Sequence, residues 1–164
     1  RFLPECILSK KAAVTLYIRA FITILFLILL FCGCSARQNQ CLVFSGGESG
    51  KVMARLPVHP YEPITLEFIN SIYRAPVRET LIFEPPENLY IVTVESPSQD
   101  VFRYYGLEPD PAGKVTLHRK VEKVRLRSSD YSNHRIKAGN LTLNLKEVVS
   151  DGESVIFDVK DCID

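Results

Sequence analysis

Glu79 is the side chain whose position in the sequence most clearly predicts a special environment. Alternate residues of an extended strand share a face, so Glu79 lies on the same side as Val77, Leu81 and Phe83. A carboxylate on an apolar face is costly to bury unless a cation or hydrogen-bond donors contact it. The pattern therefore predicts that a specific partner holds Glu79.

The residues just before Glu79 supply several such partners. We expect Arg74 to be the first choice and Arg78 the second, while the hydroxyls of Ser71 and Tyr73 could donate hydrogen bonds. One interpretation is a pocket for an anion or another polar ligand, in which an arginine clamps a carboxylate. The other is a structural ion pair that fixes a strand crossing, or an edge residue at the rim of the sheet.

A second candidate surface lies in residues 101–106, where Arg103 precedes Tyr104 and a further tyrosine. Aromatic rings beside a guanidinium group can stack on a ligand or on a partner protein. The alternative is packing within a sheet, with one phenol donating a hydrogen bond to a backbone carbonyl.

No set of residues has the spacing of a catalytic or metal site. His59, His118 and His134 lie far apart in the chain, and we expect each to be a surface or structural residue. The Gly-x-Ser-x-Gly elbow of many hydrolases is absent, although a spatial triad that uses Ser71 or Ser96 stays open. CxxC pairs and histidine clusters are absent too, so the sequence predicts no metal, no cofactor and no enzymatic activity.

The N-terminal segment is typical of an exported protein. An apolar run of thirteen residues, 20–32, follows a leader with four basic residues and ends just before Gly33 and Cys34. This order predicts a signal peptide over residues 1–33, and its end resembles a bacterial lipobox, in which Cys34 is lipidated. The alternative is an uncleaved anchor helix, for which the run is short because a bilayer-spanning helix needs about 20 apolar residues. Both alternatives place the domain on the extracytoplasmic (periplasmic) side of a membrane, joined to its anchor by a polar tether over residues 34–40.

The five cysteines fit this location. Cleavage and lipidation would remove Cys6 and Cys32 and modify Cys34, which leaves Cys41 and Cys162 near opposite ends of the domain. In an oxidising compartment such a pair is more often bridged than free. The sequence therefore predicts a disulfide between Cys41 and Cys162, with two buried free thiols as the alternative.

Composition bounds the domain and its partners. Without residues 1–33 the chain keeps 131 residues, which suits a single β domain over residues 41–164. The whole chain has 20 basic and 19 acidic residues, and the leader contains four of the basic residues and one of the acidic residues. The remaining chain therefore has 16 basic and 18 acidic residues, a net charge of −2. This balance argues against nucleic acid, because phosphate binding needs a strongly basic surface. We expect the basic segment 119–127 to be a strand with Val124 and Leu126 inward, and contact with anionic lipid headgroups is the alternative.

The elements that must position these residues are strands. Apolar and polar residues alternate with period two, as in half-buried strands, over residues 64–68, 115–117, 124–126, 141–145 and 155–159. Residues 89–94 are more continuously apolar and β-branched, as in a strand covered on both faces. Turn residues separate the strands at 45–50, 84–88, 109–113, 128–130 and 150–152. We therefore expect an all-β domain, an antiparallel sandwich or small barrel of about eight to ten short strands, preceded by an N-terminal signal or anchor helix and with no helix after residue 40.

The segment 68–79, Phe-Ile-Asn-Ser-Ile-Tyr-Arg-Ala-Pro-Val-Arg-Glu, resembles the signature of a small bacterial family, domain of unknown function 1850. The usual pattern is an aromatic residue, an apolar residue, His-Ser, a short spacer and Pro-Val-x-Glu, and Asn70 stands here in place of the histidine. Segments 41–44, 51–57 and 104–106 also fit, so the resemblance covers roughly residues 41–160. It implies an exported β-rich protein, often encoded beside TRAP-type solute transporters of the TAXI class, and implies no reaction.

Together these features favour a non-enzymatic, membrane-tethered accessory or binding domain associated with solute transport. Its expected partners are the membrane, through lipid or an anchor helix, and by resemblance the components of a TRAP transporter. An envelope hydrolase and a structural envelope lipoprotein remain as alternatives.

Overall fold

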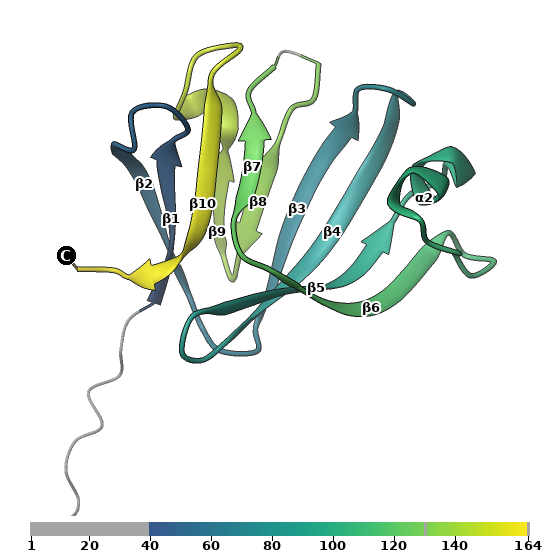
Figure 1. Ribbon diagram of the computed structural model, residues 1–164, viewed down its shortest axis with the longest axis horizontal. Helices are drawn as coiled ribbons and strands as arrows, with labels where there is room; N and C mark the ends of the chain where they lie inside the picture. Colours follow the sequence, from purple (N-terminus) through teal and green to yellow (C-terminus); the bar gives the residue numbers. More distant parts are fainter. Residues whose placement is uncertain (1–39, 130, 164) are drawn as a thin grey trace, which may run out of the picture. The chain divides into compact units, whose positions relative to one another are not determined.

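The computed structural model describes residues 40–129 and 131–163, which belong to one compact unit. The predicted all-β fold is confirmed, because these residues contain ten strands and one short α-helix (Figure 1). The strands are β1 (Gln40–Gly46), β2 (Val52–Val58), β3 (Pro63–Asn70), β4 (Ala75–Glu84), β5 (Asn88–Glu95), β6 (Lys114–Val121), β7 (Val124–Arg127), β8 (Arg135–Ala138), β9 (Leu141–Asn144) and β10 (Ser154–Asp161). Helix α2 (Gln99–Tyr105) follows β5, and a short 3-10 helix, η1 (Leu145–Glu147), follows β9.

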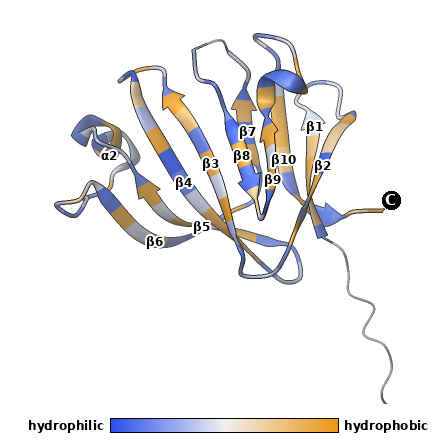
Figure 2. Cartoon of the chain, turned by 180° about the vertical axis from the view of Figure 1, so that it is seen from behind, coloured by the Kyte–Doolittle hydropathy of each residue, from blue (hydrophilic) through white to orange (hydrophobic). Residues whose placement is uncertain are grey.

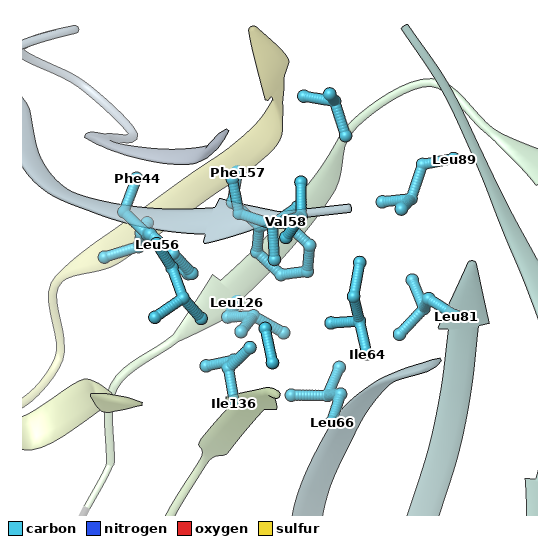
Figure 3. Packing of buried hydrophobic residues seen from close by; sticks show 14 of the residues in the cluster. Phe44, Leu56, Val58, Ile64, Leu66, Leu81, Leu89, Leu126, Ile136 and Phe157 are labelled. Carbon is cyan, nitrogen blue, oxygen red and sulfur yellow. The ribbon is translucent and has the colours of Figure 1, made fainter. Parts of the chain in front are cut away.

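The strands form two antiparallel sheets that enclose the main core. One sheet has the order β2-β1-β10-β7 and the other has the order β6-β5-β4-β3-β8-β9. Side chains of both sheets meet in one apolar cluster, where Phe44 and Phe157 of the first sheet lie with Ile64, Leu66 and Leu81 of the second (Figure 3). Removing each such side chain from water stabilises the fold by about 1.5–3 kcal/mol, which holds the two sheets together.

Strand β4 shows the predicted alternation along its whole length. Val77, Glu79, Leu81 and Phe83 are buried, and the residues between them are more exposed. Hydrophobic and hydrophilic colours alternate along β4 accordingly (Figure 2). This strand carries the one charged residue of the inward set, Glu79, into the interior.

The apolar sequence of β5 predicted a strand covered on both faces. The structure shows that it is not. Leu89 and Val94 are buried, and the residues between them are only partly buried. The register with both neighbouring strands shifts between Ile91 and Thr93. Such a bulge moves the inward-facing positions from odd to even numbers, which explains why apolar residues occupy both parities.

The basic segment 119–127 is not one strand, in contrast to the prediction. Strand β6 ends at Val121 on the edge of the six-stranded sheet, and β7 begins at Val124 on the edge of the four-stranded sheet. The chain therefore changes sheets between them. Val124 and Leu126 do pack on the core, as predicted.

Two short helices occur where no helix was expected. Residues 101–105 lie in α2, whose Val101 and Phe102 are buried beside Val77 of β4. Gly106 ends this helix in the left-handed conformation, with a φ of 65°. A helix of seven residues makes only two turns, too few to produce a recognisable 3.6-residue period. Leu145, expected to be the last residue of a strand, begins η1.

The predicted disulfide is present. Cys41 of β1 and Cys162, just after β10, are bonded to each other. A structural disulfide is typical of proteins in an oxidising, extracytoplasmic compartment. Within the described residues no helix is long and apolar enough to cross a membrane. The predicted signal peptide or anchor, the lipidation site Cys34 and tether residues 34–39 lie outside the described residues.

Candidate functional site

A cleft of about 510 Å³ lies between β7 and the six-stranded sheet. Leu66 and Phe68 of β3 and Glu79 of β4 line it from the six-stranded sheet, and all of β7 lines it from the other sheet. The last two residues of α2, the start of the β3–β4 turn and the loop between β7 and β8 contribute the remaining walls. The cleft thus joins elements that are far apart in the sequence.

Glu79 is the buried acid of this cleft, with only 6% of its surface exposed, as its strand parity predicted. The phenol of Tyr105 donates a hydrogen bond to Glu79 Oε1 over 2.9 Å. Burial raises the pKa of Glu79, and the hydrogen bond from Tyr105 offsets this by a smaller amount. Burial and the nearby Glu79 carboxylate likewise raise the pKa of Tyr105. Glu79 therefore keeps its proton to a higher pH than an exposed glutamate does.

The prediction that Arg74 or Arg78 contacts Glu79 is wrong. Arg78 lies on the opposite face of β4, where it pairs with Glu67 at 3.2 Å and with Glu95 at 3.7 Å. Successive strand residues point to opposite faces, so Arg78 cannot reach the side of the sheet that Glu79 occupies. Arg74 is exposed in the β3–β4 turn, with a φ of 52°, and forms no ion pair with another described residue.

The other polar residues near the β3–β4 turn shape the turn. Asn70 Oδ1 accepts hydrogen bonds from the backbone N–H groups of Ile72 and Tyr73, at 3.0 and 3.1 Å. This is the Asx-turn geometry that favours asparagine at the first position of a tight turn. Ser71 and Tyr73 donate no hydrogen bond to Glu79, whose donor among the described residues is Tyr105.

His134 lies at the opposite end of the cleft. It was expected to be a surface or structural residue, and it is buried. Ser132 Oγ lies 3.1 Å from His134 Nδ1, and Ser129 Oγ lies 2.5 Å from Ser132 Oγ. The imidazole stacks on Phe68 with 5.3 Å between ring centroids. Burial lowers the pKa of His134, so the neutral imidazole is favoured.

Glu79 and His134 do not form a catalytic pair. Glu79 lies opposite Leu66 of β3, and Leu66 lies opposite Ile136 of β8, two residues after His134. Two strand spacings and two residues along a strand separate Cα atoms by about 12 Å. Among the described residues no carboxylate contacts the His134 ring, so the Ser132–His134 pair lacks the orienting acid of a hydrolase triad.

Apolar and aromatic side chains form the outer border of the cleft, which we call the aromatic rim (Ile72, Tyr73 and Tyr104). Ile72 and Tyr104 line the cleft and are 63% and 62% exposed. Tyr73 packs on Tyr104 edge to face, with 6.3 Å between centroids. Of the predicted pair in this region, Tyr104 therefore belongs to the site. Arg103 does not, since it is exposed and pairs with Asp100 at 2.9 Å.

A second hollow of about 670 Å³ lies on the outer face of the six-stranded sheet. Its charged residues are already paired, since Glu67 bonds to Lys137 and Arg78, and Glu95 bonds to Lys114. The hydrogen bond from Lys137 is the main reason that the pKa of Glu67 lies below its usual value. These charged side chains are partly or largely exposed and have ion-pair partners, whereas the cleft contains the buried carboxyl group of Glu79, so the cleft is the stronger candidate site.

The described residues contain no group of three metal-ligating side chains. Comparison of the chain with protein-family models, curated proteins and solved structures found no match.

Three residues that line the cleft were not predicted from the sequence as site residues: Tyr105, Ser132 and His134. A parity signal for His134 does exist, because it has the same strand parity as the buried residues Ile136 and Ala138. Tyr105 carries no such signal, because its orientation depends on how α2 packs on the sheet.

Proposed function

We propose that this protein is a non-enzymatic, membrane-tethered binding domain that assists a solute transporter on the extracytoplasmic side of the membrane. The cleft is its binding site, and the aromatic rim is the part of the surface that a partner or solute contacts first. The N-terminal apolar run, the disulfide and the resemblance of segment 68–79 to the family with transporter neighbours support the location and the association.

The observation that carries the binding role is the state of Glu79. Its carboxyl group is buried in a cleft, and Tyr105 is its only hydrogen-bond partner among the described residues. A carboxyl group can form several hydrogen bonds, and a purely structural role for Glu79 would leave most of them unformed. A ligand that enters the cleft can form the remaining hydrogen bonds to this carboxyl group.

The exposed border of the cleft supports a partner that is larger than a solute. Exposed aromatic residues beside a concave site are typical of protein interfaces. The rim lies at the β3–β4 turn, and strand direction places this turn at the opposite end of the domain from Gln40, where the described chain begins (Figure 1). A partner can therefore approach the rim from the side away from the anchor.

A hydrolase is the second candidate, because Ser132 Oγ and His134 Nδ1 are within hydrogen-bond distance in the same cleft. No carboxylate among the described residues contacts His134, and Ser132 is buried; both observations weigh against a hydrolase. If the domain is a hydrolase, a fluorophosphonate probe should label the wild type at Ser132, and Ser132→Ala should abolish both the labelling and the hydrolytic activity. Under the binding role, that probe leaves Ser132 unlabelled.

Co-purification tests the proposal. The full chain is extracted from membranes with detergent, and captured proteins are identified by mass spectrometry, for the wild type, Tyr104→Ala and Tyr61→Ala. Tyr61 is a matched control, because it is 67% exposed and lies between β2 and β3, at the other end of the domain. We expect the wild type and Tyr61→Ala to capture a transporter component and Tyr104→Ala to lose it. Equal capture by all three variants, or no transporter component in any of them, would contradict the proposal.

A further inference from the structure

Strand β7 has a free edge that opens on the cleft. It pairs with β10 on one side and is the last strand of its sheet (Figure 1). The cleft is lined by four consecutive residues, Val124, Arg125, Leu126 and Arg127. Consecutive strand residues point to opposite faces, so a cleft that contacts all four must run along the edge of the strand.

The hydrogen bonds of the ladder show which backbone groups this edge presents. Ser128 lies opposite Glu153 in continuation of the β7–β10 register, and its N–H donates to the Glu153 carbonyl over 2.8 Å. Hydrogen-bonded and non-bonded pairs alternate along an antiparallel ladder. Leu126 therefore directs its N–H and carbonyl toward β10. Arg125 and Arg127 direct theirs toward the cleft.

The side chains of β7 select what can pair with this edge. The Arg125 and Arg127 side chains are exposed, whereas Leu126 packs in the core. Arg127 Nε donates to the Gly152 carbonyl, and Arg125 forms no ion pair with another described residue. Cross-strand neighbours of opposite charge stabilise a sheet, so the segment beside β7 should carry acidic residues at alternate positions.

The positions between those acids would face the interior of the cleft. There they meet Phe68, the Glu79 carboxyl group, the Tyr105 phenol and the His134 ring. These groups form an apolar floor with a hydrogen-bonding group at each end. Side chains that are apolar or uncharged suit this floor, because a charged group would be desolvated there without a counter-ion.

Two of the other sheet edges are protected in ways that β7 is not. Strand β2 carries Pro57, which lacks a backbone donor, and β6 carries Lys114, Arg119 and Lys120 along its length. Strand β7 has two arginines as well, but its edge faces a concave surface with buried polar groups.

We infer that the cleft binds an extended peptide segment of a partner protein, which adds to the free edge of β7 as a further strand and alternates acidic with apolar residues. This inference rests on the proposed binding function and specifies its ligand. Main-chain hydrogen bonds to Arg125 and Arg127 provide affinity, and the alternating side chains provide specificity.

A display library of random linear decapeptides, selected against the full chain in detergent micelles, tests the inference. We expect the selected peptides to alternate acidic with apolar residues. Their affinity is then measured for the wild type, Arg125→Ala and Arg125→Pro. Proline at this position removes an N–H that faces the cleft and leaves the β7–β10 hydrogen bonds in place. We expect Arg125→Pro to bind at least about tenfold more weakly than Arg125→Ala, which also lacks the guanidinium group but keeps the backbone N–H.

Selected peptides with N-methyl groups at single positions give a second measurement, which does not depend on the folding of the proline variant. Their affinity for the wild type should fall at every second residue. The inference is overturned if no peptide is enriched over empty micelles, or if neither proline nor N-methylation weakens binding. It is also overturned if Arg125→Pro converts a dimer into a monomer, because the edge then pairs with a second copy. If Arg125→Pro still captures the transporter component, the proposed function stands and strand addition fails.

Discussion

Replacing the buried acid of the cleft by its amide tests the central assignment of the site. Glu79→Gln keeps the shape of the side chain and keeps an oxygen that accepts the hydrogen bond from Tyr105. It removes the ability to ionise and replaces the other oxygen by an NH2 group. We expect the free energy of unfolding of this variant to lie within about 0.5 kcal/mol of the wild-type value at pH 4.5, and to exceed the wild-type value increasingly at higher pH.

The sign of this pH dependence follows from the direction of the pKa shift. A glutamate in the unfolded chain loses its proton near pH 4.5, and folded Glu79 keeps its proton to a higher pH because burial raises its pKa. Between the two pKa values the folded state binds more protons, so the wild-type protein loses stability as the pH rises. The glutamine variant cannot ionise and avoids this loss.

Tyr105→Phe should act in the opposite direction, because it removes the one donor to Glu79 among the described residues. A hydrogen bond to a neutral acceptor stabilises by about 1 kcal/mol, and one to a charged acceptor by about 1.5–3 kcal/mol. The loss of unfolding free energy should therefore be about 1 kcal/mol where Glu79 is protonated, and it should grow to about 2 kcal/mol above its pKa. In the Glu79→Gln background the loss should stay near 1 kcal/mol at every pH.

Urea unfolding followed by circular dichroism between pH 4.5 and pH 9 measures these differences. Glu67→Gln is the control, because its pKa is lowered by Lys137 and its contribution has the other sign. Its stabilisation is present above pH 4.5 and is lost as the pH falls, so this variant should be slightly less stable than the wild type at neutral pH. If Glu79→Gln proved the less stable protein at pH 8, the pKa of folded Glu79 would have to lie below that of the unfolded chain. The conclusion that burial is the main influence on this carboxyl group would then be refuted.

Three further predictions concern other parts of the protein. Burial lowers the pKa of His134, so the wild type should lose stability below pH 6.5, where the unfolded chain binds the proton. Thermal unfolding at pH 7 and at pH 5.5 should show a smaller loss of stability for His134→Gln than for the wild type. An equal loss in both proteins would contradict this prediction. Replacing Cys41 and Cys162 by serine should lower the free energy of unfolding by about 5 kcal/mol in the chain-entropy description, because the bridge spans 121 residues of sequence. Non-reducing peptide mapping that finds both thiols free would remove its basis. Palmitate labelling should disappear in Cys34→Ala while export continues, and label that persists would argue against lipidation at Cys34.

The parts of the fold that could be predicted from the sequence are those set by local alternation. The inward face of β4, including the burial of Glu79, follows directly from period-two parity. The same rule, applied to Arg78, would have excluded it as a partner, because adjacent strand residues cannot share a face. The bulge in β5 was missed because an extra residue and two-sided burial both produce an unbroken apolar run.

The composition of the cleft could not be predicted, because it depends on contacts between distant segments. Tyr105 is 26 residues from Glu79 and reaches it only because α2 packs across the end of the sheet. Residues 119–127 have a uniform charge pattern, yet the chain changes sheets within them, and this change gives β7 the edge that borders the cleft. No local pattern records where a strand leaves one sheet for the other.

The cystine also determines how the domain responds to mechanical load. Tension carried by the segment before Gln40 enters the fold at the start of β1, beside Cys41. The disulfide passes that tension to Cys162 at the end of β10, and the hydrogen bond from Gln40 Nε2 to Asp161 Oδ1 spans the same two strands. Pulling at this end therefore cannot peel β1 away from β10 residue by residue. Load applied at Gln40 is therefore carried jointly by the first and last strands of the domain.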